Sequence, residues 1–309
     1  MLSFAHRLIW HAKRLHHRRI AAGVLATPPI RPHDDGVVLL SMVGTAAVLP
    51  ALVALKSLHA QLGRGRVALL DDGSLTNRDR ALLAHHLGNP AITRIRDVDL
   101  GAAPAGGTWE RLLHLLDLRR DQYVLQVDSD TVTLGAVPEI QQAIDASRDF
   151  TLRGEAGAEL IEVDALRGRE RGPDPRAAGL HVQDAAEAAM VQVRIPGGGF
   201  RRYARGCSGF AGFAPGGPGR DLAEAFSREM DRLIGRERWS RWGSEQVTSN
   251  VIVANGHDPL LLPYDRYCNH EGRPLAADVR FAHFIGTCRF HGRAYRDATR
   301  ASIAALGRG

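Results

Sequence analysis

The sequence predicts an α/β protein with a mixed, mostly parallel central sheet flanked by helices. Between residues 36 and 135, short apolar runs alternate with longer segments whose apolar residues recur at helical spacing. Repeated β-α units of this length are typical of a parallel sheet with helices on both faces. The chain has 309 residues, of which 44% are hydrophobic, and this is enough to bury a sizeable core.

The first part of the chain alternates strands and helices. The strands are expected at residues 37–42, 66–70, 92–95 and 123–127. The helices are expected at residues 49–62, 77–87 and 109–118. The second helix should end at Gly88 and Asn89, because both residue types tolerate the left-handed backbone that closes a helix. In such folds, ligands bind where the carboxyl ends of the strands meet, and Asp71, Asp72 and the aspartates after residue 127 stand there.

The second part of the chain is less regular. Residues 167–176 are charged and contain prolines, so we expect a loop, and the Pro-Gly-Gly-Gly sequence at 196–199 indicates a turn or hinge. The remaining elements are a strand at 208–213, helices at 221–234 and 244–253, a strand before Tyr264 and a helix from about Arg296. We see no internal repeat and no linker long enough to separate independent domains.

The charge balance does not indicate a nucleic-acid surface. The formal net charge is +6, and Lys13 and Lys56 are the only lysines, so nearly all the positive charge is arginine. The arginines are scattered along the chain, and aromatic residues make up only 6% of it, which leaves little for base stacking. The three cysteines are an odd number without C-x-x-C spacing, so a reducing cytoplasm is the expected compartment.

One apolar run is long enough on paper to cross a bilayer. It covers residues 36–55, but Gly44 and Pro50 interrupt it. We therefore interpret it as a buried strand at 37–42, a tight turn and a helix from about Val48, with a membrane span as the alternative.

The N-terminal twenty residues predict a basic amphipathic helix. One face carries Phe4, Leu8, Ala12 and Leu15, and the other side carries Arg7, His11, Arg14 and Arg18. Such a helix could lie on an anionic membrane surface, which would place the protein peripherally at the inner face of the membrane. The interpretation that we favour is a helix packed on its own domain, or a frayed tail, since most amphipathic helices cover a core.

The first motif with chemistry is Asp128-Ser129-Asp130. It follows an apolar strand directly, so two carboxylates at a strand end can converge on one divalent cation. Hard oxygen ligands suit Mn²⁺ or Mg²⁺, and such ions bridge diphosphate oxygens. A lone acidic turn or helix cap is the alternative.

Two further clusters stand near the ends of predicted elements. His283 ends an apolar stretch, Gly286 permits close backbone approach, and Arg289 could hold a phosphate. Glu245 lies at a predicted helix start with Ser244 as its N-cap, and it could orient a reacting hydroxyl. A structural histidine and a capped helix are the respective alternatives.

The order of these pieces resembles family 8 of the GT-A glycosyltransferases, the group that includes glycogenin and bacterial lipopolysaccharide galactosyltransferases. It is also similar to bacterial proteins described as nucleotide-diphospho-sugar transferases. The matching pieces span most of residues 37–291. They are Asp71-Asp72-Gly73-Ser74-Leu75-Thr76, Arg111-Leu112-Leu113, Asp128-Ser129-Asp130, Ser208-Gly209-Phe210, Glu245-Gln246 with Asn250, Leu262-Pro263-Tyr264, and His283 with Gly286 and Arg289.

This resemblance implies a role for each matching residue. The metal ligands would be Asp128, Asp130 and His283. The residues beside the reacting sugar would be Glu245, Gln246 and Asn250. The donor site would use Asp72, Arg111, Asp128, Ser129, Asp130, Ser208, Gly209, Gly286 and Arg289. Family 8 enzymes retain anomeric configuration, so retention is expected.

The resemblance also implies a domain organisation. A basic helical extension, residues 1–35, would precede one GT-A domain, residues 36–309. Within it, residues 36–135 would form the nucleotide-binding half, and residues 136–309 would form the acceptor-side half with the C-terminal helix.

Some residues depart from the family pattern. Glu245 stands where the family has Asp, and its extra methylene shifts the carboxylate by about an ångström or more, enough to affect alignment. Arg289 replaces Lys and is followed by Phe290 instead of Pro-Trp, and Cys207 stands where Asn is common. These changes leave the metal ligands intact and bear on donor choice and stereochemistry.

The sequence therefore predicts a metal-dependent glycosyltransferase that uses a nucleotide sugar, with uridine as the expected base and a glycan or lipid-linked saccharide as the expected acceptor. Two alternatives share the fold. A nucleotidyltransferase would need a glycine-rich basic loop after the first strand, and residues 43–47 hold one glycine and no lysine. The other alternative is a degenerate protein that binds a nucleotide or glycan without catalysis.

Overall fold

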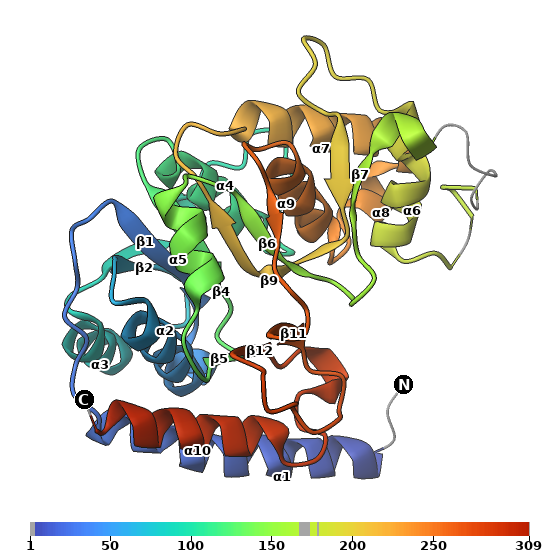
Figure 1. Cartoon of the computed structure of the whole chain (residues 1–309). Coiled ribbons are helices and arrows are strands. Elements are labelled where there is room, and N and C mark those ends of the chain that lie inside the picture. The colour runs from blue at the N-terminus through green and yellow to red at the C-terminus, as the bar shows by residue number, and fades with distance from the viewer. Residues whose placement is uncertain (1–3, 167–173, 178, 309) are drawn as a thin grey trace. The chain divides into compact units, whose positions relative to one another are not determined.

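The structure is a computed structural model that describes residues 4–166, 174–177 and 179–308; the side chains of residues 4–7, 166 and 287 are outside this description. The chain divides into two compact units (Figure 1). Unit 1 comprises residues 1–94, 127–141 and 263–309, and unit 2 comprises residues 95–126 and 142–262. Both units combine strands with helices, as the α/β prediction requires.

Unit 1 contains a parallel sheet of β1 (Val37–Val43), β2 (Arg66–Asp71) and β3 (Ala91–Arg94). The connecting helices are α2 (Val48–Leu62) and α3 (Asn77–Leu87). β1 and β2 are almost wholly buried, in agreement with their continuous apolar sequences. The register pairs Val43 with Asp71, so the loops that follow these two strands begin side by side.

Local signals in the sequence set the bounds of α3. Thr76 accepts a hydrogen bond from the Asp79 backbone N–H, and the Asp79 carboxylate accepts one from the Thr76 N–H, which forms a capping box. Gly88 closes the helix with a φ of +68°, a conformation that costs glycine little.

A second, three-stranded sheet of unit 1 has the order β11 (Tyr267–Asn269), β12 (Phe281–His283) and β5 (Thr131–Thr133). β12 is antiparallel to β5 and parallel to β11. This sheet brings residues that are far apart in the sequence into register.

The two ends of the chain pack together within unit 1. Helix α1 (Phe4–Ala21) lies beside α10 (Ala294–Leu306), as Figure 1 shows. Trp10 meets Phe290 edge to face at 5.2 Å, and His17 stacks on Tyr295 at 3.8 Å between ring centroids. The His17 Nε2 atom also lies 2.9 Å from Thr299 Oγ1. The N-terminal helix is therefore attached to its own unit through Trp10 and His17.

His17 is expected to make stability depend on pH. Burial, with smaller effects of Arg289 and His16, lowers the pKa of His17 from 6.5 to about 4. The unfolded chain therefore binds the proton more readily than the folded protein, so stability falls as the pH drops from 6.5 toward 4, by about 3 kcal/mol for this group. His17→Phe keeps a ring against Tyr295 and should remove that part of the pH dependence in urea unfolding.

The matched control is His11→Phe, the same change at an exposed position of the same helix, which should keep the wild-type pH dependence. Parallel curves of unfolding free energy against pH for wild type and His17→Phe would contradict the prediction.

Unit 2 has its strands in the order β4 (Tyr123–Val127), β9 (Gly206–Phe213), β6 (Phe150–Arg153) and β10 (Leu260–Leu261). β6 is antiparallel to β9 and parallel to β10, so the sheet is mixed. A small hairpin pairs β7 (Leu160–Glu162) with β8 (Arg202–Ala204). The helices are α4 (Trp109–Leu118), α6 (Val182–Ala189), α7 (Arg220–Ile234), α8 (Arg236–Trp239) and α9 (Ser244–Ala254).

A buried ion pair joins loops of unit 2. Arg119 and Asp149 are both fully buried, and Arg119 Nη2 lies 2.9 Å from Asp149 Oδ1. Arg119 also donates to the carbonyl oxygens of Ala214 and Pro218, and Asp149 accepts from the Ala214 N–H. A Cβ atom at Gly217 would lie 2.0 Å from Arg119 Nη2, so this loop approaches only because the residue is glycine. Burial raises the pKa of Asp149, and Arg119 opposes part of that rise.

The predicted elements of residues 36–127 are confirmed, with α3, α4 and β4 at their predicted bounds. The run at 36–55 is indeed a strand followed by a helix, and 61% of the apolar stretch Thr45–Leu62, which is long enough to cross a membrane, is buried inside the protein. The predictions for 208–213, 221–234, 244–253, the strand before Tyr264 and the C-terminal helix hold within two residues, and 196–199 forms a turn.

Other features of the sequence prediction need correction or lie outside the description. The sequence prediction did not contain β5, α5 (Pro138–Asp145), β6, α6, β7, β8, α8, β11 or β12. Ser244 is not the N-cap of α9: Gly243 holds that position at φ +106°, and the Ser244 hydroxyl accepts from the Trp109 indole at 2.9 Å. The predicted loop at 167–176 lies largely outside the described residues. The expected division at residue 135 between a nucleotide-binding half and an acceptor-side half stays a prediction.

Candidate metal centre and donor site

The metal centre predicted from sequence is assembled within unit 1 by strand register. Asp128 and Asp130 lie in the turn between β4 and β5, and Asp130 is buried. Strand β12 pairs His283 with Thr131, one residue after Asp130. The Phe284 N–H donates to the Asp130 carbonyl oxygen at 2.9 Å and extends that pairing. A histidine more than 150 positions away is thus brought against the Asp-x-Asp turn.

The three side chains converge on one point. His283 Nε2 lies 3.2 Å from Asp130 Oδ1 and 3.7 Å from Asp128 Oδ2, and one ligand atom of each residue lies within 4.8 Å of the other two. Asp128 is partly exposed, whereas Asp130 and His283 are buried. Two carboxylates and one imidazole in this spacing fit a divalent cation such as Mn²⁺ or Mg²⁺.

Asn269 orients the histidine. It lies on β11 in register with His283, and its Oδ1 atom is 3.1 Å from His283 Nδ1. An Nδ1–H that donates to Asn269 leaves the Nε2 lone pair facing the two aspartates.

Asn269→Leu should weaken metal binding because the ring loses the acceptor that sets its tautomer. Replacing such supporting residues typically costs about 10- to 100-fold in metal affinity. Titration of Mn²⁺ by isothermal calorimetry measures the change. The control is Asn89→Gly, which removes an exposed asparagine at a helix end with φ +57° and should leave the Mn²⁺ affinity unchanged. Equal Mn²⁺ affinity for Asn269→Leu and wild type would show that Asn269 does not hold the ring.

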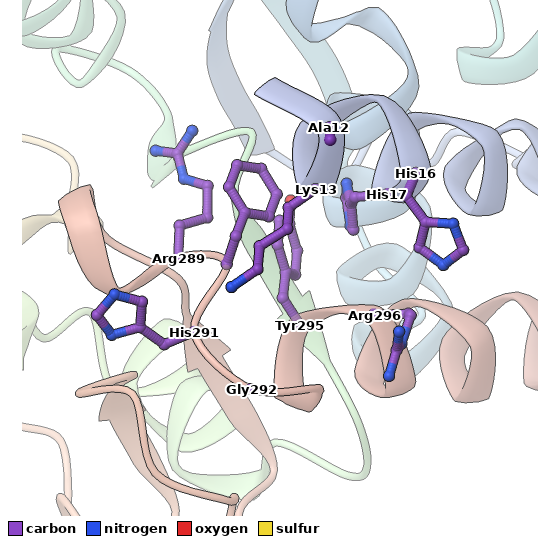
Figure 2. Close-up of a pocket in the computed structure, with 10 residues that line it drawn as sticks. Ala12, Lys13, His16, His17, Arg289, His291, Gly292, Tyr295 and Arg296 are labelled. Carbon is purple, nitrogen blue, oxygen red and sulfur yellow. The ribbon is translucent and has the colours of Figure 1, made fainter. Parts of the chain in front are cut away.

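Asp130 is held in its charged form. Its burial acts to raise its pKa, but His283 and then Arg289 outweigh this effect, so the pKa of Asp130 lies below its usual value. Arg289 forms an ion pair through Nη2 with Asp130 Oδ2, and its Nε donates to the Phe284 carbonyl oxygen at 2.9 Å. The residue predicted to hold phosphate therefore contacts the carboxylate of a candidate metal ligand. It adjoins a cavity between α1 and residues 289–296 (Figure 2).

The loops after β1 and β2 join at the same edge of the parallel sheet. Asp72 is exposed and accepts from the Ser74 N–H and hydroxyl, and Thr45 N–H donates to Ser74 Oγ at 3.0 Å. A Cβ atom at Gly44 would lie 2.0 Å from Asp72 Oδ2, so a larger residue there would displace the Asp72 carboxylate. Asp71 is buried, accepts from the Gly73 N–H and pairs with Arg80, which makes it a support of the turn.

Two other predicted donor-site residues lie in turns of unit 1. Ser129 is half-buried between the two aspartates. Gly286 is exposed at the start of a short 3-10 helix, η6 (Gly286–Cys288), with φ +48°. A positive φ at this position favours glycine.

The Glu245 cluster lies in unit 2. Glu245 is buried at the first turn of α9 and accepts from the Thr108 hydroxyl at 2.8 Å and the Ser208 hydroxyl at 3.2 Å. Arg111, which is also buried, has its Nη2 atom 3.5 Å from Glu245 Oε1. The structure thus brings together Glu245, Arg111 and Ser208, which the sequence had placed in one donor and acceptor site.

The other residues of this cluster contact the neighbouring strand. Gln246 Oε1 accepts from the Ser208 N–H at 3.3 Å, and Asn250 Nδ2 donates to the Gly206 carbonyl oxygen at 3.1 Å. Gly209 lies in the buried strand β9. In this structure Gln246 and Asn250 tie α9 to β9.

Sequence reasoning missed Asn269 and Thr108. Asn269 contacts His283 and Thr108 donates to Glu245, and each pair is distant in sequence. A polar residue at the end of a short strand is the only signal that Asn269 carries, and it does not distinguish Asn269 from other asparagines.

Solved glycosyltransferases of the GT-A fold share this architecture. The bifunctional glycosyltransferase WbbM matches with a TM-score of 0.50 at 13% identity over 91% of this chain, which spans about half (53%) of the WbbM chain. The galactosyltransferase LgtC matches with a TM-score of 0.51 at 10% identity, covering 86% of this chain and 95% of LgtC. GlyE of Streptococcus pneumoniae matches with a TM-score of 0.51 at 13% identity, covering 88% and 62%.

No family model and no curated protein matches the sequence. At these identities the likeness establishes the fold, so the α/β GT-A architecture predicted from the sequence is confirmed. Assignment to family 8 stays a prediction.

Proposed function

We propose that the protein is a metal-dependent glycosyltransferase that takes a sugar from a nucleotide-sugar donor. The observation that carries this proposal is the convergence of Asp128, Asp130 and His283 within 4.8 Å, at the end of β4 in a GT-A fold. A cation bound there would supply Lewis-acid stabilisation of a departing diphosphate.

The residues of the chain would divide the remaining work. Asp128, Asp130 and His283 would hold the ion, and Asn269 would keep the imidazole in the binding tautomer. Arg289, already at Asp130, would place a guanidinium beside the diphosphate. In unit 2, Glu245 would face the acceptor hydroxyl, with Arg111 and Thr108 fixing its carboxylate.

The finer features of the proposal rest on the resemblance to family 8. We propose a uridine-linked donor, Mn²⁺ as the ion, retention of anomeric configuration, and a glycan or lipid-linked saccharide as acceptor. We also propose that the protein works in the cytoplasm, where nucleotide sugars and reduced cysteines would both be found.

Calorimetric titration of UDP and other nucleoside diphosphates, with Mn²⁺ or with EDTA, tests the proposal. We expect one of them to bind only with the metal. Metal-free binding of a nucleotide with no sugar released from any nucleotide sugar would favour the degenerate binding protein. No metal-dependent binding of any nucleoside diphosphate would overturn the transferase proposal.

A further inference from the structure

Helix α1 exposes an apolar stripe on the side opposite its packed face. Leu8 is 62% exposed and Leu15 is 45% exposed, and Ala12 between them is also exposed. At about 100° per residue these three share one stripe, and Leu8 is about 180° round the helix from His17. His17 and Trp10 make the contacts that attach the helix, so packing does not account for the leucines.

This outcome reverses the burial expected from the sequence. The helix is packed on its own unit, as we favoured, but the predicted apolar face points away from that unit; the side chain of Phe4 lies outside the description. Five large apolar side chains are exposed in the described part of the chain. Four of them lie between residues 8 and 25, namely Leu8, Ile9, Leu15 and Leu25. Such a concentration marks an interaction surface.

The charges around the stripe are of one sign. Helix α1 carries Arg7, Lys13, Arg14, Arg18 and Arg19 and has no acidic residue. At the same spacing Arg18 and Arg14 lie to one side of the stripe, Arg19 lies at its C-terminal end, and Lys13 lies between the other side of the stripe and the packed face; all four are exposed. An apolar stripe bordered by cations is typical of a helix that lies in the plane of a membrane surface.

A basic cavity adjoins the same helix. It has a volume of about 280 Å³, and none of its ten lining residues is acidic. Figure 2 shows Lys13 and His16 from α1, and His291 and Arg296 from the C-terminal segment, around it. This cavity offers cations to a headgroup phosphate beside the apolar stripe.

We propose that the outward face of α1 docks unit 1 on an anionic phospholipid bilayer. The leucines would enter the boundary between headgroups and acyl chains, and the surrounding cations would bind the lipid phosphates. A second copy of the chain fits this face poorly, because pairing α1 with another α1 would bring two rows of cations together. The proposal is independent of the proposed function.

Co-sedimentation with vesicles tests this proposal on the full chain. We expect binding to vesicles of phosphatidylcholine mixed with phosphatidylglycerol, and little binding to phosphatidylcholine alone. The double variant Leu8→Ser/Leu15→Ser should lower the partition coefficient about tenfold or more, since two buried leucines are lost. Lys13→Gln/Arg14→Gln should lower it about tenfold as well and reduce its dependence on salt.

Matched controls remove similar surface elsewhere. Trp242→Ser removes the most exposed large apolar side chain, and Arg228→Gln/Arg232→Gln removes two exposed charges from α7. Both should bind vesicles as wild type does. The proposal is overturned if wild type ignores the anionic vesicles, or if Leu8→Ser/Leu15→Ser binds them equally well. It is also overturned if the leucine variant only dissolves a dimer seen by analytical ultracentrifugation.

Discussion

Replacing Asp130 with asparagine is expected to lower metal-dependent sugar transfer on the order of a thousandfold, because the ligand charge that holds the cation is lost. Asp130 is the buried carboxylate of the candidate metal centre and lies 3.2 Å from His283 Nε2. Asparagine has the same shape, so the loss should come from charge and not from packing. Release of the nucleoside diphosphate from the donor, measured at saturating Mn²⁺, gives the rate.

Two comparisons separate catalysis from stability in this experiment. Asp278→Asn makes the same change at an exposed position of unit 1 and should leave the rate unchanged. Thermal unfolding in EDTA should show both variants folded. A rate for Asp130→Asn within a few-fold of wild type would remove Asp130 from the metal centre.

The second large effect is expected at the buried ion pair of unit 2. Arg119→Met would leave the Asp149 carboxylate buried without its partner, at a cost of about 3–5 kcal/mol in the free energy of unfolding. The carbonyl oxygens of Ala214 and Pro218 would lose their donor at the same time. Urea unfolding monitored by tryptophan fluorescence measures the loss of stability. Without Arg119 the pKa of Asp149 should rise farther, so Asp149 is protonated and neutral at low pH and the loss of stability is smaller there.

The double variant Arg119→Met/Asp149→Leu should recover much of the loss, because no uncompensated charge then remains buried. Arg241→Met serves as the control: its pair with Glu237 is exposed, so the expected change is below about 1 kcal/mol. A double variant less stable than Arg119→Met alone would show that hydrogen bonds, not the buried charge, dominate at this site.

The elements that could be predicted from the sequence are those with a continuous apolar run or with apolar residues at helical spacing. Strands β1, β2 and β4 are continuous apolar runs, and α4 has its apolar residues on one face. The Asp-x-Asp turn was recognisable because it follows an apolar strand directly. Three-residue strands such as β5 and β12 are too short for a period to appear, so they could not be found this way.

The rest of the candidate site depends on contacts between distant segments. The pairing of β11 with β12 brings Asn269 to His283, and neither residue carries a local sign of it. Arg289 was expected to hold a phosphate, yet in the structure it contacts Asp130. The sequence could name the ligands through the resemblance, but it could not reveal what supports them.

The division of the chain has a consequence for synthesis. Unit 2 is complete once residue 262 has been made, whereas unit 1 waits for residues 263–309. That late segment contains His283, and it also supplies the rings of Phe290 and Tyr295 against which Trp10 and His17 pack. On the ribosome, α1 would emerge before residues 263–309 and would lack these partners until that segment has been made. A chain stopped before residue 263 would keep every residue of unit 2, lack one of the three candidate metal ligands, and leave the aromatic side of α1 uncovered for chaperones to bind.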